Sequence, residues 1–461
     1  MIIVSHRGPF AFRRTDDGFE ARRGAGGVVS ALGPLLLGDD APGRRSDEQV
    51  RWVAAAIGDD DRAAVAAGEA DVDEVDLHLL ALDRAEHRAH YDVISNSVLW
   101  FLLHGLYDLT RRPRFDERFF EAWDAYEAVN TAFAQSVSEF ASEDETVLVQ
   151  DYQLFLVPGL LRAARPDLKV AFFCHTPFCG PNSIRVLPDD VAAALCSSVA
   201  SVPTGFHTDR WARGFTASVR EVLGDGTSLT TFVAPLGPDR AALEAVVSSE
   251  RSREAREALD DLAGDCSLIV RSDRIEPSKN IVRGFQTYEA LLERHPRWQG
   301  RVVFVAMLYG SREGLPEYLA YRSEVEQAVA AVNRRFATDD WEPVHLFTDD
   351  DFPRSLAGLA RADVLFVNPI RDGLNLVAKE GPVVNTRDAV LCLSREAGSW
   401  SELGDAALAV HPYDLVHGAD TLDRALSMSE EERSERAARL RALAQARTPA
   451  DWLSDQLDAA R

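Results

Sequence analysis

Residues 368–380, Asn-Pro-Ile-Arg-Asp-Gly-Leu-Asn-Leu-Val-Ala-Lys-Glu, combine side chains and spacing that suit the binding of a sugar nucleotide. The apolar run before them, residues 362–367, is typical of a parallel strand buried on both faces, and residues 376–380 contain no helix breaker and predict the start of a helix. A helix start presents free N–H groups and a positive dipole end, which bind phosphate. Asp372 and Glu380 add carboxylates that suit sugar hydroxyls. The alternative is an ordinary strand–turn–helix connection with a solvated acidic residue, since short turn motifs recur by chance.

Further candidate residues follow directly after other predicted strands. In doubly wound sheets, ligands bind beyond the carboxyl ends of the strands, so polar residues at those points are candidates for a site. They are Arg7, Asp151 and His175 in the first half of the chain, and Arg274, Lys279, Arg312, Asp372, Asn375 and Glu380 in the second. Each has a plain alternative: a helix N-cap for Asp151, a satisfied core histidine for His175, a solvated turn for Arg274 and Lys279, and the surface for Arg312.

The elements that must position these residues alternate between short apolar strands and longer helical patterns. The first series of strands is predicted at residues 2–4, 51–56, 75–82, 146–150, 169–174 and 198–203. The second series follows a strand-like segment at 230–235 and is predicted at residues 267–271, 301–308, 343–348, 362–367, 389–393 and 406–410. Helical patterns include residues 28–37, 116–140 and 429–447. Such alternation predicts an α/β fold with two doubly wound, Rossmann-like parallel sheets, which we place in residues 1–237 and 238–448.

A glycine cluster, which includes Gly26 and Gly27, follows the first strand and precedes the first helix. Glycine would let the backbone approach a bound ligand closely. The cluster does not have the G-x-G-x-x-G spacing of dinucleotide-binding proteins, and the tip of a flexible hairpin is the alternative.

The net charge of −24 argues against nucleic acids and anionic membranes as partners. A phosphorylated substrate would therefore need cations concentrated locally. Two facing sheets would form one interdomain cleft that contains Arg7, Arg274, Lys279 and Arg312, which meets this need. Only three of the 50 basic residues are lysines. Lys279 and Lys379 both lie in motif-like segments, where a compact point charge suits a role that arginine cannot fill.

The sequence indicates a cytoplasmic protein. No apolar run approaches the ~20 residues that a membrane-spanning helix needs, and the N-terminus leads directly into a strand without the features of a signal peptide. The five cysteines are scattered. Cys174 and Cys179 have no second ligand pair for a zinc site, so buried, reduced thiols are expected.

Taken together, the motifs resemble those of the trehalose-6-phosphate synthase family, which are retaining glycosyltransferases with two facing Rossmann domains, the GT-B fold. The segments that carry the resemblance come in the same order along nearly the whole chain. They are Ser5-His-Arg-Gly-Pro9 with Gly26 and Gly27, Tyr91 with Ser95-Asn-Ser-Val-Leu-Trp100, Gln150-Asp-Tyr-Gln153, residues 172–178, Arg274-Ile-Glu-Pro-Ser-Lys279, and residues 371–380. The last is similar, almost letter for letter, to the family's Arg-Asp-Gly-Met-Asn-Leu-Val-Ala-Lys-Glu.

The resemblance implies a role for each matching residue. Arg274 and Lys279 would hold the donor diphosphate, with backbone N–H contacts from Asn375, Leu376 and Val377, and Glu380 would bind the ribose. Asp372 and His175 would bind the hydroxyls of the donor sugar, near Gly26 and Gly27. Arg7, Tyr91 and Arg312 would hold the acceptor phosphate, with Trp100 and Asp151 near the acceptor sugar. Asp151, His175, Arg274, Lys279 and Asp372 would thus form the catalytic set. The family's final helix returns to the first domain, and we expect the same of residues 449–461.

This chain also departs from the family pattern near the expected substrate sites. Gln150 and Gln153 replace both histidines of His-Asp-Tyr-His, and Pro277 and Asn280 replace the tyrosine and glycine of Arg-Leu-Asp-Tyr-Ser-Lys-Gly. Pro382 falls where the family continues a helix, and a proline is tolerated in a first helical turn but not deep inside a helix. The departures leave the donor base and the acceptor open.

The expected reaction is the transfer of glucose from GDP- or UDP-glucose to glucose 6-phosphate, which gives α,α-trehalose 6-phosphate. No metal or other cofactor is expected, because cations and helix termini can stabilise the leaving diphosphate. The partners would be small-molecule substrates, with a homo-oligomer possible. Alternatives are a glucosylglycerol phosphate synthase, an enzyme that couples aminocyclitols, a non-catalytic sugar-phosphate sensor or regulatory subunit, and a nucleotide-sugar epimerase. The arginine-rich composition resembles that of high-GC actinomycetes, where guanosine donors are plausible.

Overall fold

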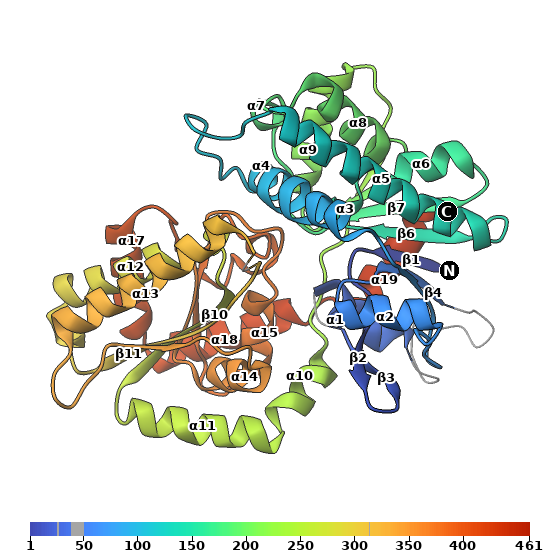
Figure 1. The fold of residues 1–461 in the computed structure, drawn as a ribbon. Helices are drawn as coiled ribbons and strands as arrows, with labels where there is room; N and C mark the ends of the chain where they lie inside the picture. Colours follow the sequence, from blue (N-terminus) through green and yellow to red (C-terminus); the bar gives the residue numbers. More distant parts are fainter. Residues whose placement is uncertain (25–26, 38–49, 313) are drawn as a thin grey trace. The chain divides into compact units, whose positions relative to one another are not determined.

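The computed structural model of the chain describes residues 1–24, 27–37, 50–312 and 314–461 (Figure 1). The chain divides into two compact units. Unit 1 consists of Met1–Leu236 and Pro449–Arg461, and unit 2 of Gly237–Thr448. The chain therefore passes between the units twice, next to Gly237 and next to Thr448. These two passages lie side by side, because a Cβ atom on Gly237 would lie 1.8 Å from the carbonyl oxygen of Arg447.

Unit 1 contains a sheet of parallel strands. Within the described residues their spatial order is β5 (Asp76–Leu80), β4 (Arg51–Ala55), β1 (Ile2–Ser5), β6 (Thr146–Gln150), β7 (Lys169–Cys174), β8 (Thr204–Phe206) and β9 (Thr231–Val233). A separate antiparallel hairpin joins β2 (Phe10–Thr15) to β3 (Gly18–Arg23). The sequence did not reveal this hairpin, because most positions of its two strands are exposed and several carry charged side chains.

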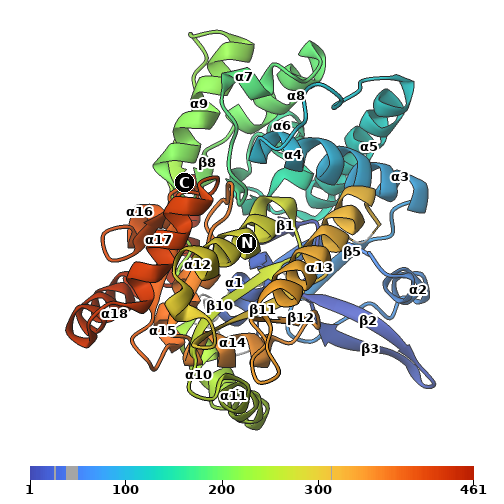
Figure 2. The ribbon, with the colours of Figure 1, turned by 90° about the vertical axis from the view of Figure 1, so that its left-hand side faces the viewer.

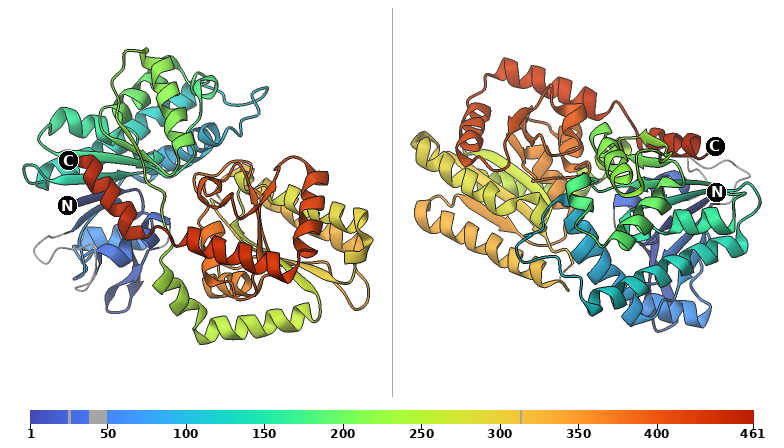
Figure 3. Two further views of the ribbon diagram at one scale, coloured as in Figure 1. Left: turned by 180° about the vertical axis from the view of Figure 1, so that it is seen from behind. Right: turned by 90° about the horizontal axis from the view of Figure 1, so that it is seen from above.

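Helices cover both faces of this sheet. They are α1 (Gly27–Leu36), α2 (Asp59–Ala67), α3 (Arg84–Arg88), η1 (Ala89–Leu99), α4 (Trp100–His104), α5 (Glu117–Phe140), η2 (Tyr152–Leu154), α6 (Val157–Ala164), α7 (Pro181–Ile184), α8 (Asp189–Ala200), α9 (Asp209–Leu223) and the C-terminal α19 (Pro449–Ala460). Neighbouring residues of β7 show which face α19 covers. Phe172 contacts Phe155, just before α6, while Phe173 contacts Trp452 of α19. Since successive residues of a strand point to opposite faces, α6 and α19 lie on opposite faces of the sheet (Figure 3).

Unit 2 repeats this plan. Its parallel strands, in spatial order, are β12 (Val344–Phe347), β11 (Val302–Tyr309), β10 (Ser267–Arg274), β13 (Val364–Val367), β14 (Val390–Ser394) and β15 (Leu408–Val410). Its helices are α10 (Arg240–Val247), α11 (Glu250–Ala263), η3 (Pro277–Lys279), α12 (Ile281–Arg294), η4 (Pro296–Trp298), α13 (Pro316–Phe336), α14 (Phe352–Arg361), α15 (Val377–Val384), α16 (Trp400–Leu403), α17 (Leu415–Leu426) and α18 (Glu430–Ala444). Figure 2 shows α12 and α13 side by side near strands β10 to β12. The predicted α/β fold with two doubly wound parallel sheets is confirmed.

One predicted strand, at residues 198–203, is wrong. Helix α8 runs through Ala200, and the strand β8 begins at Thr204. The buried side chains of α8, Val191, Ala192, Leu195, Cys196 and Val199, follow helical spacing. The short apolar run at the end of this helix was mistaken for a strand.

Pro382 also differs from expectation, because it lies inside α15 rather than ending it. Its ring removes the N–H that would bond to the carbonyl of Ala378, and the helix ends two residues later at Val384. The preceding Gly381 lets this helix lie close to β13, since a Cβ atom there would be 2.6 Å from a methyl carbon of Leu365. Among the described residues, no helix has both the length and the apolar character needed to span a membrane.

Candidate active site

In unit 2, the ends of β10 and β13 bring together residues that are far apart in the sequence. Lys279, in η3, places its Nζ 2.7 Å from Oδ2 of Asp372, which follows β13. The same Nζ lies 3.7 Å from Oδ1 of Asp273, near the end of β10. The Asn375 amide donates to Asp372 at 3.0 Å, and its Oδ1 accepts from the N–H of Ala378 in the first turn of α15. These contacts fix Lys279 and Asp372 beside the start of α15, as the sequence predicts for a phosphate and sugar site.

A second cluster in unit 2 is centred on Glu276, which the sequence analysis did not single out. Arg274 Nη1 lies 3.2 Å and Arg312 Nη1 3.4 Å from Oε1 of Glu276. Ser311 donates its hydroxyl to the same oxygen at 3.0 Å. Arg312 also donates to the hydroxyl of Tyr318 and lies over its ring. Glu276 follows β10 by two residues, and its position between two predicted cations was the signal that could have identified it.

The charges of this cluster stabilise one another. Burial alone would raise the pKa of Glu276, but Arg274, Arg312 and Lys279 outweigh it and hold this pKa at about 2. Burial alone would lower the pKa of Lys279, but Asp372 and Asp273 together raise it. Glu276 is therefore anionic and Lys279 cationic at neutral pH.

Helix α15 supplies the remaining predicted donor-binding residues. Leu376 and Val377 lie at its N-terminus, where backbone N–H groups face away from the helix. Glu380, in its first turn, is partly buried, and burial raises the pKa of its carboxyl to about 7. Such a carboxyl can donate or accept a hydrogen bond near neutral pH. Lys379 points elsewhere: it is fully buried and pairs with Glu402 of α16 at 2.8 Å.

In unit 1, His175 follows β7 and is held from two sides. Its ring Nε2 lies 3.0 Å from Oε1 of Gln150, and its backbone N–H donates to Oδ1 of Asp151 at 3.2 Å. Asp151 has a φ of 72° and does not cap the following η2 with its side chain, so the N-cap alternative does not hold. Burial lowers the pKa of His175 to about 3, which keeps the ring neutral.

The C-terminal helix α19 supports this histidine. The ring of Trp452 lies 5.5 Å from that of His175, centroid to centroid. Gln456 accepts a hydrogen bond at 2.8 Å from the amide of Gln150, which holds His175. Gln150, a departure from the family's histidine, therefore links α19 to His175.

Arg7 and Tyr91, two of the predicted acceptor-binding residues, lie together in unit 1. Nη2 of Arg7 is 3.5 Å from the hydroxyl of Tyr91. Arg312, the third, belongs to unit 2. Tyr91 is part of η1, a π-helical segment in which the N–H of Trp100 bonds to the carbonyl of Ser95, five residues earlier. Such segments are rare and frequently occur at functional sites.

The structure adds three histidines beside Tyr91 that the sequence analysis missed. The ring of His6 stacks on Tyr91 at 4.5 Å, and its Nε2 lies 3.0 Å from Nε2 of His87. His90 Nε2 lies 2.8 Å from the carbonyl of Gln153. Burial lowers the pKa of His6, of His87, and of His90, the last to about 4. Their spacing in the sequence, with His6 far from the other two, gave no sign of this cluster.

Three other predicted residues are placed as follows. Trp100 is only 2% exposed and packs against Phe101 and His104, so its position is in the interior of unit 1. Gly27 is the first residue of α1, and Gly26 lies outside the described residues. Within the part of the chain that the structure describes, no group of three or more His, Cys, Asp or Glu side chains is arranged to hold a metal ion.

Comparison with known proteins gives consistent matches over the whole chain. The model of glycosyltransferase family 20 matches residues 1–461. An Aspergillus fumigatus protein named alpha,alpha-trehalose-phosphate synthase (UDP-forming) 2 is 31% identical, over 98% of this chain and 95% of that protein. The trehalose-6-phosphate synthase of Mycolicibacterium smegmatis is 30% identical, over 99% of this chain and 92% of that protein. A crystal structure of an alpha,alpha-trehalose-phosphate synthase (UDP-forming) from Burkholderia vietnamiensis has a TM-score of 0.83 and 26% identity, over 100% of this chain and 99% of that one.

Proposed function

Since the chain belongs to glycosyltransferase family 20, the trehalose-6-phosphate synthase family with its GT-B fold, we propose that this glycosyltransferase transfers glucose from a nucleoside-diphosphate glucose to glucose 6-phosphate. The product is α,α-trehalose 6-phosphate, with retention of configuration. One observation carries the proposal: Lys279 and Asp372, 93 residues apart in the sequence, meet at 2.7 Å beside the start of α15.

On the donor side, Arg274 and Lys279 bind the diphosphate together with the N–H groups at Asn375, Leu376 and Val377. An exposed face supports this role for Arg274, whose side chain is 45% exposed although one edge pairs with Glu276. Glu380 binds the ribose, since a carboxyl with a pKa of about 7 can either donate to or accept from a hydroxyl.

The donor sugar is bound by Asp372 and His175. Asp372 accepts hydrogen bonds from Lys279 and Asn375, which fix the orientation of a carboxylate that suits a sugar hydroxyl. The neutral ring of His175 offers one nitrogen to Gln150 and the other to the substrate. Gly27, the first residue of α1, is assigned to the same side, and Gly26 lies outside the described residues.

On the acceptor side, Arg7, Tyr91 and Arg312 bind the phosphate of glucose 6-phosphate, and Asp151 lies near its sugar. Residues of both units are assigned to the reaction, so neither unit is expected to be active alone. Trp100 contributes by packing, in keeping with its buried ring.

The chemical step is a front-face displacement through an oxocarbenium-like state, in which the leaving diphosphate accepts the proton of the incoming hydroxyl. Negative charge grows on the leaving group, and Arg274 and Lys279 stabilise it through charges already in place. Their carboxylate partners keep them oriented before the substrate binds. No metal takes part, so EDTA is expected to leave the rate unchanged.

The donor base is proposed to be uracil, because two of the similar proteins carry UDP-forming in their names. The alternative base is guanine, and the experiment distinguishes the two.

The experiment is a matrix of UDP- and GDP-glucose against glucose 6-phosphate, glycerol phosphate, an aminocyclitol phosphate and no acceptor. Its readouts are the release of nucleoside diphosphate and the analysis of the product. We expect release that depends on glucose 6-phosphate and a disaccharide phosphate product. An isomerised donor, another acceptor or no turnover would refute the proposal.

A further inference from the structure

Glu276 connects two arginines that the proposed function assigns to different substrates. Arg274 is assigned to the donor diphosphate and Arg312 to the acceptor phosphate. Both guanidinium groups lie within 3.4 Å of the same oxygen, Oε1 of Glu276. Because all three residues belong to unit 2, the connection needs no group from unit 1.

The environment of Glu276 excludes direct contact of this carboxylate with either substrate as its main role. Its side chain is only 2% exposed, and Ser311 donates a hydrogen bond to it from one side. A carboxylate also repels phosphate. With a pKa of about 2, it does not act as a proton acceptor near neutral pH.

The two arginines differ in what they have left to offer a ligand. Arg274 is 45% exposed, whereas Arg312 is 10% exposed and is held on its other side by Tyr318. The positive charge of Arg312 also lowers the pKa of Arg274, which is the sign of repulsion between the two guanidinium groups, while Glu276 raises it more strongly. The carboxylate thus holds together two cations that would otherwise move apart.

We propose that Glu276 is a positioning residue that couples the binding of the two phosphorylated substrates, an inference that rests on the proposed function. An anion bound by Arg274, whose side chain is 45% exposed, restricts the motion that its ion pair with Glu276 still allows, and through Oε1 of Glu276 it restricts Arg312 as well. The second substrate then meets a site that is already ordered, so its binding costs less conformational entropy. By reciprocity, each substrate raises the affinity for the other by the same factor.

The test measures the affinity of the intact protein for glucose 6-phosphate by calorimetry, with and without saturating UDP. In the wild type, we expect UDP to tighten glucose 6-phosphate binding by about 5-fold or more, the lower end of typical coupling between sites. In Glu276→Gln, which keeps the size but loses the charge, we expect this factor to fall to about 1. If Glu276 had a purely structural role, its loss would change the thermal stability and the affinity for glucose 6-phosphate both with and without UDP. The ratio of these two affinities would stay the same.

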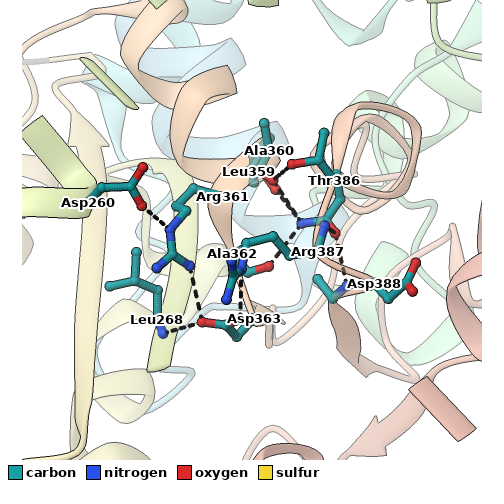
Figure 4. Close-up of polar contacts among 12 residues, drawn as sticks. Asp260, Leu268, Leu359, Ala360, Arg361, Ala362, Asp363, Thr386, Arg387 and Asp388 are labelled. Carbon is teal, nitrogen blue, oxygen red and sulfur yellow. Dashed lines mark hydrogen bonds and ion pairs between the residues drawn. The ribbon is translucent and has the colours of Figure 1, made fainter. Parts of the chain in front are cut away.

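Unit 2 offers a matched control in Asp363, a second buried carboxylate that serves several arginines (Figure 4). Asp363 accepts from Arg361 at 3.3 Å, from Arg387 at 3.2 Å and from the N–H of Leu268 at 2.9 Å. It precedes β13, so it lies at the end of the sheet opposite to Glu276. Asp363→Asn is expected to lower stability and leave the coupling factor unchanged.

Ser311→Ala is the second variant, in case Glu276→Gln does not fold. It removes only the neutral hydrogen bond that orients Glu276, and we expect a coupling factor between those of the wild type and 1. Independent binding of the two ligands to the wild type, or an unchanged factor in Glu276→Gln or Ser311→Ala, would overturn the coupling. Failure of the wild type to bind glucose 6-phosphate, or to bind either UDP or GDP, would instead refute the proposed function.

Discussion

Two of the three lysines of this arginine-rich chain lie in unit 2, and their surroundings separate their roles. Lys279 is 12% exposed at the carboxyl end of the sheet and faces Asp372. Lys379 is fully buried and burial lowers its pKa, although Glu402 opposes this shift. Both lie in motif-like segments, so the sequence could not separate them. Only Lys279 is in a position to meet a ligand.

We expect Lys279→Ala and Arg274→Ala each to lower turnover by about two decades or more, roughly 3 kcal/mol of transition-state stabilisation, because each removes a charge that we assign to the leaving diphosphate. Steady-state kinetics with saturating substrates measures this loss. Lys169→Ala is the control, since Lys169 is 42% exposed and its ion pair within the described residues is a distant one, with Asp144 at 3.9 Å. Near wild-type turnover in either site variant would contradict the assignment.

His90 leads to a prediction for the pH dependence of stability. Its Nε2 bonds to the carbonyl of Gln153, while its Nδ1 is buried without a partner among the described residues. Its pKa of about 4 in the folded state lies below the ordinary value of 6.5, so the unfolded chain binds more protons below pH 6.5. The stability that His90 contributes is fully present above about pH 6.5 and is lost as the pH falls towards 4.

Between pH 7 and pH 5, this residue alone is expected to lower the free energy of unfolding by on the order of 2 kcal/mol. His6 and His175, whose pKa values are also lowered by burial, act in the same direction. Urea unfolding of the wild type and of His90→Gln at both pH values measures the effect. The variant should lose less stability on acidification than the wild type, and an equal loss in both would rule out His90 as a source.

At the scale of elements, the sequence predicted the strands of the two parallel sheets except β8, because a buried parallel strand leaves a continuous apolar run. It could not predict the backbone of the connections that follow the strands. Asp151, Asn280, Arg312 and Asn375 all adopt positive φ there. Asn280, at 59°, stands where the family has glycine, and asparagine is the residue that best tolerates this conformation after glycine. The replacement of glycine by Asn280 is therefore compatible with a left-handed turn at this position.

The residues of the candidate site were predicted as far as each motif contributes a residue of its own. That Lys279 and Asp372 lie at the same end of the sheet followed from the rule that ligands bind beyond the strand ends. Glu276, Ser311 and the histidines beside Tyr91 could not be predicted in the same way. Their contacts depend on how the connections pack in three dimensions, and π-helical turns such as those of η1 leave no clear pattern in the sequence.

Asn375, with a φ of 74°, tests the connection between β13 and α15. In Asn375→Ala, the side-chain hydrogen bonds to Asp372 and to the N–H of Ala378 are lost, and the backbone is strained. We expect the free energy of unfolding to fall by about 2–3 kcal/mol. The positive φ accounts for about 1–2 kcal/mol of this loss, and the lost cap for about 1 kcal/mol. In Asn375→Gly the strain is relieved, and the variant should be more stable than Asn375→Ala.

Chemical denaturation measures both stabilities, and donor KM provides a second readout. Asp372 loses the same amide donor in the two variants, so both should show a raised donor KM. Equal stability of the alanine and glycine variants would show that the positive φ is not a source of strain.

At the scale of the whole molecule, the charge of −24 is distributed so that the arginines are largely occupied in ion pairs with carboxylates, as around Asp363 and Glu276. The same pairing holds the cations of the candidate site in place. The sequence predicts the need for local cations, but not that a buried anion accompanies them. An excess of acidic residues is therefore compatible with anionic substrates.

The last helix, α19, joins a distant part of the chain to unit 1, and Trp452 tests how much unit 1 depends on it. Trp452 is fully buried against Phe173 and His175. We expect Trp452→Ala to destabilise unit 1 by about 3–5 kcal/mol, as for other buried tryptophans.

Hydrogen exchange should show reduced protection in β6 and β7 and unchanged protection in β10 and β11, because the lost contacts lie in unit 1. The reciprocal control is Trp298→Ala, which removes a hydrogen bond to Asp423 in unit 2 and should affect β10 and β11 instead. Equal loss of protection in both sheets after Trp452→Ala would show that the two units unfold as one, and that α19 stabilises the whole chain rather than the sheet it covers.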